Sequence, residues 1–388
     1  MVQSGFALFN LGFRPFFLAA SWFAVVAMVV WMAAYSFGLN WSGLPAIVWH
    51  GHEMIFGYST AVLAGFLLTS VRNWTGKPTP AGVHLVVIVG CWLVARVALL
   101  VDSDLAIVVA CVADVLFMGL VIAGVSLPII EVKQWRQVGI VVKLVLLLLS
   151  NMLFYSGLFG YVAEGMQWGL YSGLYMVIAL IFVLARRVFP FFVLAATARK
   201  VELTNYPWLD RASLILFFGF WLAAVFFQVP MVTAALAGSL VLLHGMRMVG
   251  WYTREVWSRP LLWVIYLAYG FMVLGFALQA AAPWFFTQYL SLHAFAIGGV
   301  GIMTIGMMAR VSLGHSGRDV YTPPKGLVVV FGLLIGSAFS RVLLPLIMPE
   351  YYGQFIFVAQ VCWLVSFAWF VWIYTPILVL PRADGKPE

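Results

Sequence analysis

The sequence predicts an all-α integral membrane protein of about twelve transmembrane helices, and two properties of the chain indicate this. Hydrophobic residues make up 64% of the 388 residues and charged residues 9%, whereas a soluble domain carries roughly 25% charged residues. Apolar stretches of ~20 residues, the length that crosses a bilayer core, recur from end to end. The strands of a membrane β-barrel would instead alternate over ~10 residues, so a barrel is excluded.

Hydropathy places the predicted spans along the whole chain, at 16–38, 53–72, 82–101, 104–126, 137–163, 168–188, 212–228, 230–249, 260–281, 288–311, 326–347 and 354–380. The tightest connections fall at 102–104 and 228–230. The longest loop, about 189–211, is too short to fold alone. The chain is therefore expected to form a single polytopic transmembrane domain over 1–388.

The distribution of lysine and arginine predicts that both termini are cytoplasmic. Basic residues gather before the first span and after every even-numbered span, and the alternate loops have essentially none. Basic loops stay on the cytoplasmic side of a bacterial inner membrane, and an even number of spans agrees with this. The net charge of +8 is spread over these loops, so it does not indicate a nucleic-acid partner.

Histidines are the most informative polar residues, because they gather at the two predicted membrane faces. The orientation places three of the six at the outer face and three at the inner face: His50, His52 and His293 outside, and His84, His244 and His315 inside. His84 has no partner in the sequence and is expected to have no role in a site. The three cysteines form neither a CxxC pair nor a CxxCH haem-attachment motif, and they are expected to pack as small apolar residues.

The segment His50-Gly51-His52-Glu53 opens the second span from the outside. If the helix begins after Gly51, the two rings can meet one metal ion, with the carboxylate beside them. If the helix begins earlier, residues two apart face different ways and have separate roles. The alternative to a metal site is that His50 is an interfacial residue and His52 caps or packs the helix.

His293 lies inside the tenth span, where an ionisable group is costly and is a candidate for function. The helix that follows is rich in glycine, at 298, 299, 301 and 306. One interpretation is a close helix crossing that small residues make possible. The other is a flat cofactor that lies against the glycines, with His293 as an axial ligand of haem.

His315 follows His293 by 22 residues, or ~33 Å along a continuous helix, so one cofactor cannot touch both. Gly314 and Gly317 indicate that the helix has ended before His315. His315 and His244 can then form an inner pair of ligands. Hydrogen bonding within a loop is the alternative for His315.

Arg96 and Arg341 are placed in the outer thirds of the third and eleventh spans, where a buried guanidinium needs an acidic partner. Haem propionates are one candidate, because arginine pairs with planar carboxylates through two hydrogen bonds. A protein carboxylate is the other, and Asp102, Asp104 and Asp114 are the candidates in the chain.

Long stretches of the chain resemble the NnrS family, namely HGHEMIFGYSTAVLAGFLLTSVRNWTG at 50–76 and GIMTIGMMARVSLGHSGR at 301–318, with support from GFRPFFLAA at 12–20 and LHGMRMVGW at 243–251. The resemblance covers the whole chain and implies an inner-membrane protein of denitrifying and related bacteria. It implies haem and copper as cofactors, and an association with nitric oxide metabolism and nitrosative stress. The motif residues that it singles out are His50, His52, Glu53, His293 and His315, with His244 less securely matched.

Residues and resemblance together predict a haem b protein, with copper as a second metal, that handles nitric oxide or moves electrons to a centre that does. His293 with His52 or His50 would ligate an outer haem, and a remaining outer histidine or the inner pair would take copper. Electrons would come from quinol or a partner protein. The alternatives are a secondary transporter of a small solute or metal, and a non-catalytic sensor or maturation factor for a nitric oxide metalloenzyme.

Overall fold

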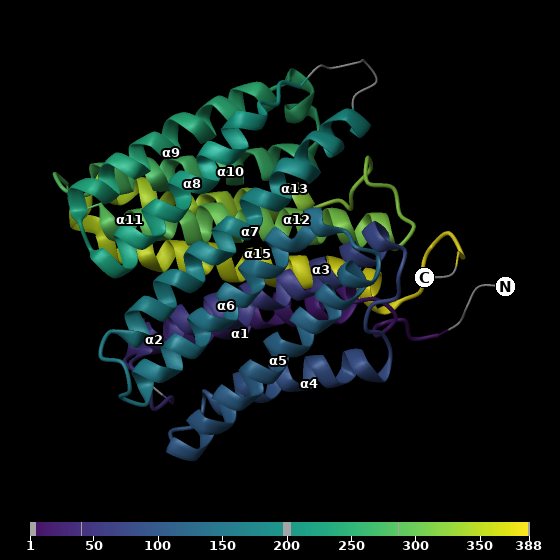
Figure 1. Cartoon of the computed structure of the whole chain (residues 1–388), viewed down its shortest axis with the longest axis horizontal. Helices are drawn as coiled ribbons and strands as arrows, with labels where there is room; N and C mark the ends of the chain where they lie inside the picture. The colour runs from purple at the N-terminus through teal and green to yellow at the C-terminus, as the bar shows by residue number, and fades with distance from the viewer. Residues whose placement is uncertain (1–4, 40, 197–202, 286, 387–388) are drawn as a thin grey trace. The chain divides into compact units, whose positions relative to one another are not determined.

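The computed structural model describes residues 5–39, 41–196, 203–285 and 287–386, and within them it contains helices and no strands (Figure 1). The prediction of an all-helical protein is confirmed. Eleven helical runs in the described residues are long and apolar enough to cross a membrane, and Val83–Ala98 is a shorter apolar helix. At ~1.5 Å per residue, these 16 residues span about 24 Å, somewhat less than a bilayer core of ~30 Å. The number of spans and their orientation stay predictions.

The helical runs follow the predicted spans in order. They are α1 (Phe13–Phe37), α2 (Ala46–His52) with η1 (Glu53–Ser59) and α3 (Thr60–Thr75), α4 (Val83–Ala98), α5 (Asp104–Glu131), η2 (Trp135–Gln137) with α6 (Val138–Leu158), α7 (Gly165–Ala196), α8 (Pro207–Leu222) with η3 (Ala223–Phe227), α9 (Pro230–Trp251), η4 (Arg254–Ser258), α10 (Pro260–Ala281), α11 (Gln288–His293) with η5 (Ala294–Gly301) and α12 (Ile302–His315), α13 (Leu327–Ala338) with η6 (Phe339–Leu343) and α14 (Leu344–Ile347), and η7 (Pro349–Tyr351) with α15 (Tyr352–Val379).

Several predicted boundaries were wrong: the helices differ from them by five residues at 126, 163 and 212 and by more at 53 and 188. The second run begins at Ala46 rather than at 53, and α7 continues to Ala196 rather than ending at 188, with Pro190 inside the helix. The predicted end of α12 before His315 was also wrong, because Gly314 lies inside the helix. Glycine is well tolerated in apolar spans. Gly317, with φ at +71°, adopts the left-handed conformation that commonly follows a helix end.

Four segments of the described helices are π-helical, and three of them adjoin residues that the sequence singled out. η1 begins directly after His52, η5 begins directly after His293, and η6 contains Arg341; the fourth is η3. A π-helical segment inserts an extra residue into an α-helix and is frequent at functional sites. Hydropathy does not reveal such segments, yet they decide which way the neighbouring side chains point.

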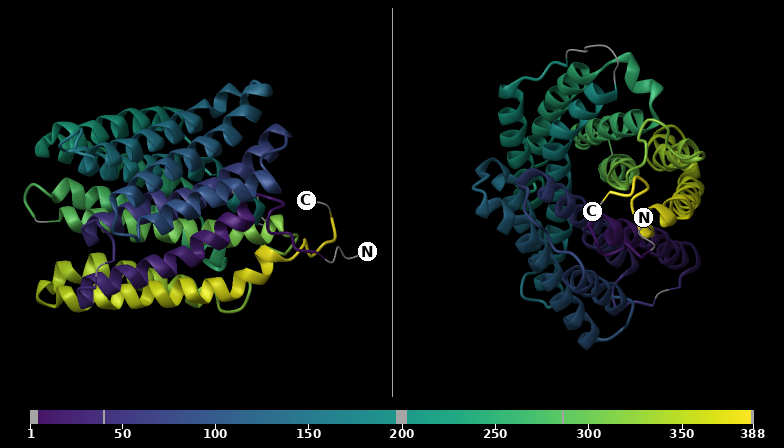
Figure 2. Two further views of the ribbon diagram at one scale, coloured as in Figure 1. Left: turned by 90° about the horizontal axis from the view of Figure 1, so that it is seen from below. Right: turned by 90° about the vertical axis from the view of Figure 1, so that its right-hand side faces the viewer.

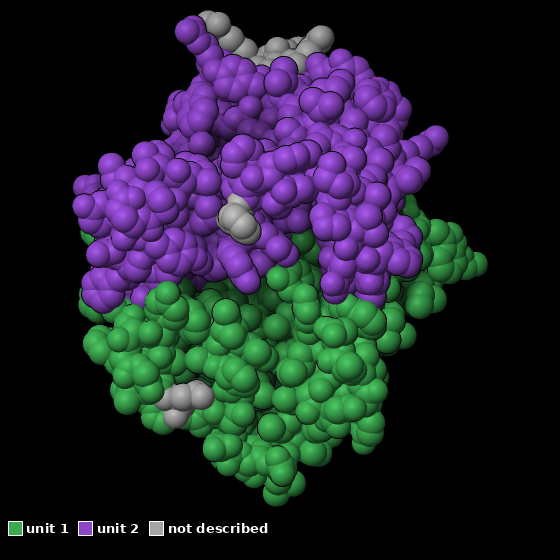
Figure 3. All heavy atoms as spheres, turned by 90° about the vertical axis from the view of Figure 1, so that its left-hand side faces the viewer, with its two compact units in different colours: residues 1–177, 308–320, 367–388 green, residues 178–307, 321–366 purple. Residues whose placement is uncertain are grey.

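The chain divides into two compact units (Figure 3). Unit 1 comprises residues 1–177, 308–320 and 367–388, and unit 2 comprises residues 178–307 and 321–366. In unit 1, α4 packs against α5, α5 packs against α6, and α1 packs against α3 (Figure 1). In unit 2, α10 packs against α9, α11 and η5.

Within unit 1 the start of α1 lies near the end of α15 (Figure 2), and Arg14 connects the two by hydrogen bonds. The side chain is fully buried, and its Nη1 donates to Leu378 O and Leu380 O, both at 2.8 Å, and to Ile377 O at 3.2 Å. The last carbonyls of a helix have no partner within it, so a cation there supplies hydrogen bonds and complements the helix dipole. The stretch GFRPFFLAA therefore has a structural role at this end of the unit.

Candidate functional site

His50 and His52 have separate surroundings, because the helix begins at Ala46 and both residues lie inside α2. The His50 ring is half-buried and stacks on Trp31, with ring centroids 4.4 Å apart and planes at 15°. His52 is fully buried. The prediction that the two rings meet one metal ion required the helix to begin after Gly51, and that condition is not fulfilled.

Both ring nitrogens of His52 face oxygen atoms of unit 1. Nδ1 lies 2.9 Å from Glu53 Oε1, and Nε2 lies 3.0 Å from Asn151 Oδ1 on α6. Asp114 Oδ2 on α5 is 3.7 Å from the same Nε2. The ring is therefore held between two carboxylates and an amide, and Phe154 packs against it with centroids 4.5 Å apart.

Arg96 on α4 joins the two carboxylates. Its Nη1 donates to Glu53 Oε1 and its Nη2 donates to Asp114 Oδ1, while Tyr155 OH donates to Asp114 Oδ2 at 2.9 Å. The guanidinium is 3% exposed, and the two carboxylates are 0% and 1% exposed. The prediction that buried Arg96 has an acidic partner is confirmed, with protein carboxylates in that role. Asp114 was among the candidates, and Glu53 was expected to be a metal ligand instead.

We call the six residues that make these contacts the His52 cluster: His52, Glu53, Arg96, Asp114, Asn151 and Tyr155. Its members come from five helical segments, α2, η1, α4, α5 and α6. Asn151 and Tyr155 were missed by the sequence analysis. An amide inside an apolar helix is costly unless it is hydrogen-bonded, so Asn151 carried a usable signal. Tyrosine is common at membrane interfaces, so Tyr155 carried none.

Gly57 in η1 makes room for the guanidinium of the cluster. A Cβ at this position would lie 2.8 Å from Arg96 Nη1 and 2.7 Å from Phe23 Cε1, closer than real Cβ contacts come. The Gly57 carbonyl accepts a hydrogen bond from Trp92 Nε1 at 2.9 Å. The π-helical segment thus brings backbone and carboxylate to the same face, against α4.

A second polar cluster lies in unit 2 around His244 on α9. The ring is buried, its Nδ1 lies 2.5 Å from Tyr269 OH, and it stacks on Phe182 with centroids 4.0 Å apart. Arg247 Nη1 donates to Tyr269 OH at 3.2 Å, and its Nη2 donates to Asp210 Oδ1 at 2.8 Å. His244 Nε2 is buried and has no hydrogen-bond partner among the described residues. We call these residues, without Phe182, the His244 cluster.

His293 ends α11, and its ring is bonded to the helix backbone. Nδ1 lies 2.8 Å from Tyr289 O. Since a carbonyl oxygen only accepts, Nδ1 carries the hydrogen and the lone pair of the neutral ring is on Nε2. That tautomer is the one in which histidine can bind a metal through Nε2.

The glycines that follow His293 are covered by side chains of unit 2. A Cβ at Gly299 would lie 2.7 Å from Met272 Cγ, and one at Gly301 would lie 2.8 Å from Trp363 Cζ3. Gly298 meets the Phe271 ring in the same way. This close packing of η5 against α10 and α15 is what the helix-crossing interpretation expects.

A comparison with models of protein families shows which family the chain belongs to. The model of the NnrS protein family matches residues 7–382. The chain belongs to the NnrS family. No curated protein matches the chain. Membership fits a membrane protein connected with nitric oxide, and the resemblance found in the four motif stretches is confirmed over essentially the whole chain.

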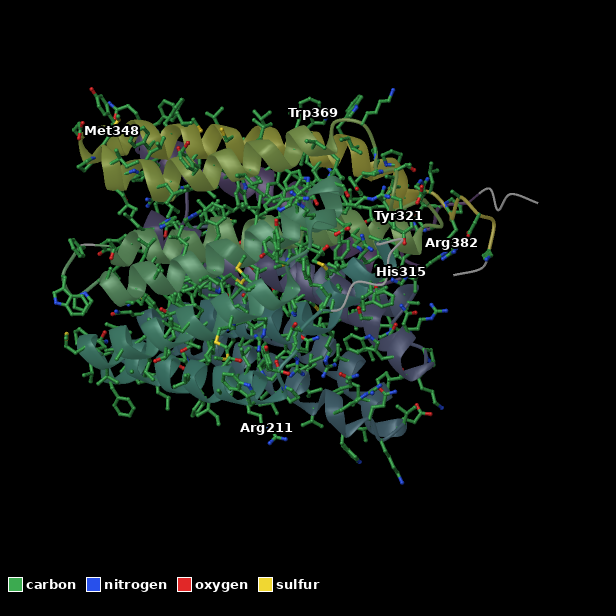
Figure 4. The ribbon with its side chains drawn as sticks, turned by 90° about the horizontal axis from the view of Figure 1, so that it is seen from above. Arg211, His315, Tyr321, Met348, Trp369 and Arg382 are labelled. Atoms are coloured by element: carbon green, nitrogen blue, oxygen red, sulfur yellow. The ribbon has the colours of Figure 1, made fainter. Side chains whose placement is uncertain are left out.

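The NnrS motif stretch around His315 holds the C-terminal segment of unit 1 (Figure 4). Arg382 Nη1 donates to His315 O at 2.9 Å, and Ala383 N donates to Ser316 O at 2.9 Å. The hydrogen bond from Arg382 lowers the pKa of Asp384 to about 2. The His315 ring lies against Phe13, at 5.7 Å between centroids. His315 and His244 thus have different contacts, and their pairing as metal ligands stays a prediction.

The remaining residues that the sequence singled out in this NnrS chain have local contacts. The Arg341 guanidinium lies over the Tyr352 ring at 5.1 Å, as a cation–π contact. His84 is exposed in the first turn of α4. The three cysteines are half-buried and form no disulfide with one another. In the part of the chain that the structure describes, no group of three or more His, Cys, Asp and Glu residues could hold a metal ion.

Proposed function

We propose that this chain is a haem b protein of the bacterial inner membrane that handles nitric oxide, in nitric oxide metabolism or the response to nitrosative stress. Family membership supports the connection with nitric oxide. One observation carries the assignment of haem: the buried His244 ring is held through Nδ1, and its Nε2 has no partner among the described residues. Electrons would come from quinol or a partner protein, and copper remains an expected second metal.

The fit of His244 to haem rests on how imidazole binds iron. A metal-bound histidine coordinates through one ring nitrogen, while the other is held by a hydrogen bond that fixes the ring. Tyr269 provides that bond, and Arg247 holds the tyrosine oxygen in place. The Nδ1 of His293 is likewise held by a hydrogen bond, to Tyr289 O. His52 does not have the arrangement of a metal ligand, because both of its nitrogens face oxygen atoms; the proposal therefore does not retain the predicted pairing of His293 with His52.

The chain's own residues would set the properties of such a site. Bound haem would supply an iron that changes oxidation state and binds nitric oxide. His244 would hold it, and the aromatic side chains of Phe182 and Phe276 around the ring would keep water away. The link from Tyr269 through Arg247 to Asp210 would fix the imidazole and tune its basicity.

An absorbance spectrum of the purified protein tests the proposal. Haem gives a Soret band that shifts on reduction with dithionite, and His244→Ala should lose haem or its low-spin spectrum. His293→Ala tests the second candidate ligand. His84→Ala, at an exposed position, should keep the wild-type spectrum. A wild-type spectrum and haem content in both the His244 and the His293 variant would refute the assignment of ligands.

A secondary transporter is the second candidate, and the His52 cluster is the observation that favours it. Ionisable residues inside membrane spans commonly mark ion or substrate pathways. A fully folded but colourless protein would support the transporter and contradict the haem proposal. A sensor or maturation factor would share the haem spectrum, but it would not turn over nitric oxide when reductant is added.

A further inference from the structure

The contacts of His52 specify where its hydrogens must be. Glu53 Oε1 faces Nδ1 at 2.9 Å, and Asn151 Oδ1 faces Nε2 at 3.0 Å. The oxygens of an ionised carboxylate and of an amide carbonyl accept hydrogen bonds and cannot donate them. Each contact is therefore a hydrogen bond only when the ring nitrogen carries hydrogen. With the amide oxygen of Asn151 toward the ring, as in the structure, both contacts are satisfied only by the doubly protonated imidazolium.

The charges of the His52 cluster also favour the doubly protonated form of His52. Arg96 contributes one positive charge, and Glu53 and Asp114 contribute one negative charge each, all of them nearly fully buried. With a neutral His52 the cluster holds one excess negative charge in an apolar interior, which is costly. One proton on His52 makes the cluster neutral.

The other groups around the ring do not supply that charge. From η1, the ring of Phe56 packs against His52, and from α6, Phe154 and Tyr155 do so. The Tyr155 hydroxyl donates to Asp114. From α5, the thiol of Cys111 lies near that carboxylate and is neutral when protonated.

We propose that the His52 cluster is a proton-binding site inside the helices of unit 1, at which His52 takes up and releases one proton. On release from Nε2, that nitrogen changes from a donor to an acceptor. The Asn151 amide can then rotate by a half-turn, so that Nδ2 faces the ring in place of Oδ1 and donates a hydrogen bond to Nε2. Asn151 Nδ2 is buried and has no hydrogen-bond partner among the described residues, so the half-turn breaks no bond made by Nδ2.

Two further buried atoms of the cluster have no hydrogen-bond partner in the described part of the chain, namely Glu53 Oε2 and Arg96 Nε. Glu53 Oε2 is an acceptor next to His52 and can accept a hydrogen bond from a proton that arrives or leaves, whereas Arg96 Nε is a donor only. Such capacity is unexpected in a purely structural ion pair, in which buried polar groups are normally satisfied. The inference does not depend on haem, because every atom in it belongs to the chain.

The test uses the whole protein in lipid vesicles, with histidine labelled by ¹⁵N in the ring. The chain has six histidines, and the His52 signals are those that disappear in His52→Gln. Solid-state NMR should show both His52 nitrogens protonated at neutral pH in the wild type. In Asp114→Asn the cluster is neutral without the proton, so one N–H signal should be lost. Tyr155→Phe keeps every charge, and it should leave both N–H signals in place.

Three outcomes would overturn the proposal. A His52 ring with a single N–H in the wild type at neutral pH contradicts the imidazolium. An Asp114→Asn protein that keeps both N–H signals shows that charge balance does not control the proton. If that variant does not fold, a pH series on the wild type decides: a ring that stays in one state at every pH at which the protein is folded is not an exchanging site. Haem content, measured on the same samples, reports on the function proposed above independently.

Discussion

Replacing Arg96 with methionine should destabilise unit 1 strongly, because the methionine fills a similar volume but leaves Glu53 and Asp114 without their cation. Removing one partner of a buried ion pair costs about 3–5 kcal/mol. The full range applies here because the guanidinium is 3% exposed and its partners are 0% and 1% exposed, so solvent screens little of the charge. At ~1.4 kcal/mol per tenfold, the ratio of folded to unfolded protein should fall roughly 100-fold to several-thousand-fold.

The assay is unfolding in detergent micelles, followed through the fluorescence of the 17 tryptophans. Lys77→Met is the matched control, since Lys77 pairs with Glu131 at positions that are 39% and 58% exposed. An exposed pair is worth about 0–1 kcal/mol. Adding Asp114→Asn to Arg96→Met should recover part of the loss, because only one buried carboxylate, that of Glu53, is then left without the guanidinium. An Arg96→Met protein as stable as Lys77→Met would refute the reasoning.

Three further outcomes are expected. Gly57→Ala should cost about 1–3 kcal/mol in the same unfolding assay, because its Cβ would displace Arg96 and Phe23, whereas Gly90→Ala, with open space around it, should not destabilise. Arg14→Leu should cost at least about 1.5–3 kcal/mol, since hydrogen bonds from a charged donor to the end of α15 are lost. A reporter that is active only in the periplasm, fused to the C-terminus, should give no signal; a strong signal would reverse the predicted orientation.

The fold class and the order of the helices could be predicted because both depend on local sequence. An apolar run of membrane length forms a helix whatever surrounds it, since its backbone groups have no other partners in lipid. The acidic partner of Arg96 was predictable for a similar reason, because a buried guanidinium cannot stay uncompensated. Which carboxylates it would meet was only half predicted: Asp114 was expected, and Glu53 was not.

The contacts of the histidines could not be predicted, because they depend on helix starts and on π-helical segments. The start of α2 at Ala46 placed His50 against Trp31 and His52 against Glu53 and Asn151. A π-helical segment rotates everything after it relative to a regular α-helix, so spacing rules fail across it. The glycines of η5 carried a signal of close packing, but no local pattern says whether a helix or a cofactor lies against them.

The difference between a histidine that holds a proton and one that can bind a metal lies in the partner of its second nitrogen. Two acceptor oxygens require a hydrogen on both nitrogens, and an imidazolium has no lone pair left for a metal. A ring that faces only one acceptor oxygen needs one hydrogen, so its other nitrogen keeps a lone pair. By this criterion His52, as placed in the structure, belongs to the first class, whereas the neutral ring of His293, whose Nδ1 donates to Tyr289 O, carries its lone pair on Nε2. His244 belongs to the second class when its Nδ1 donates to the hydroxyl oxygen of Tyr269, which also accepts from Arg247. Depth in the membrane had grouped His52 with His293; their hydrogen-bond partners separate them.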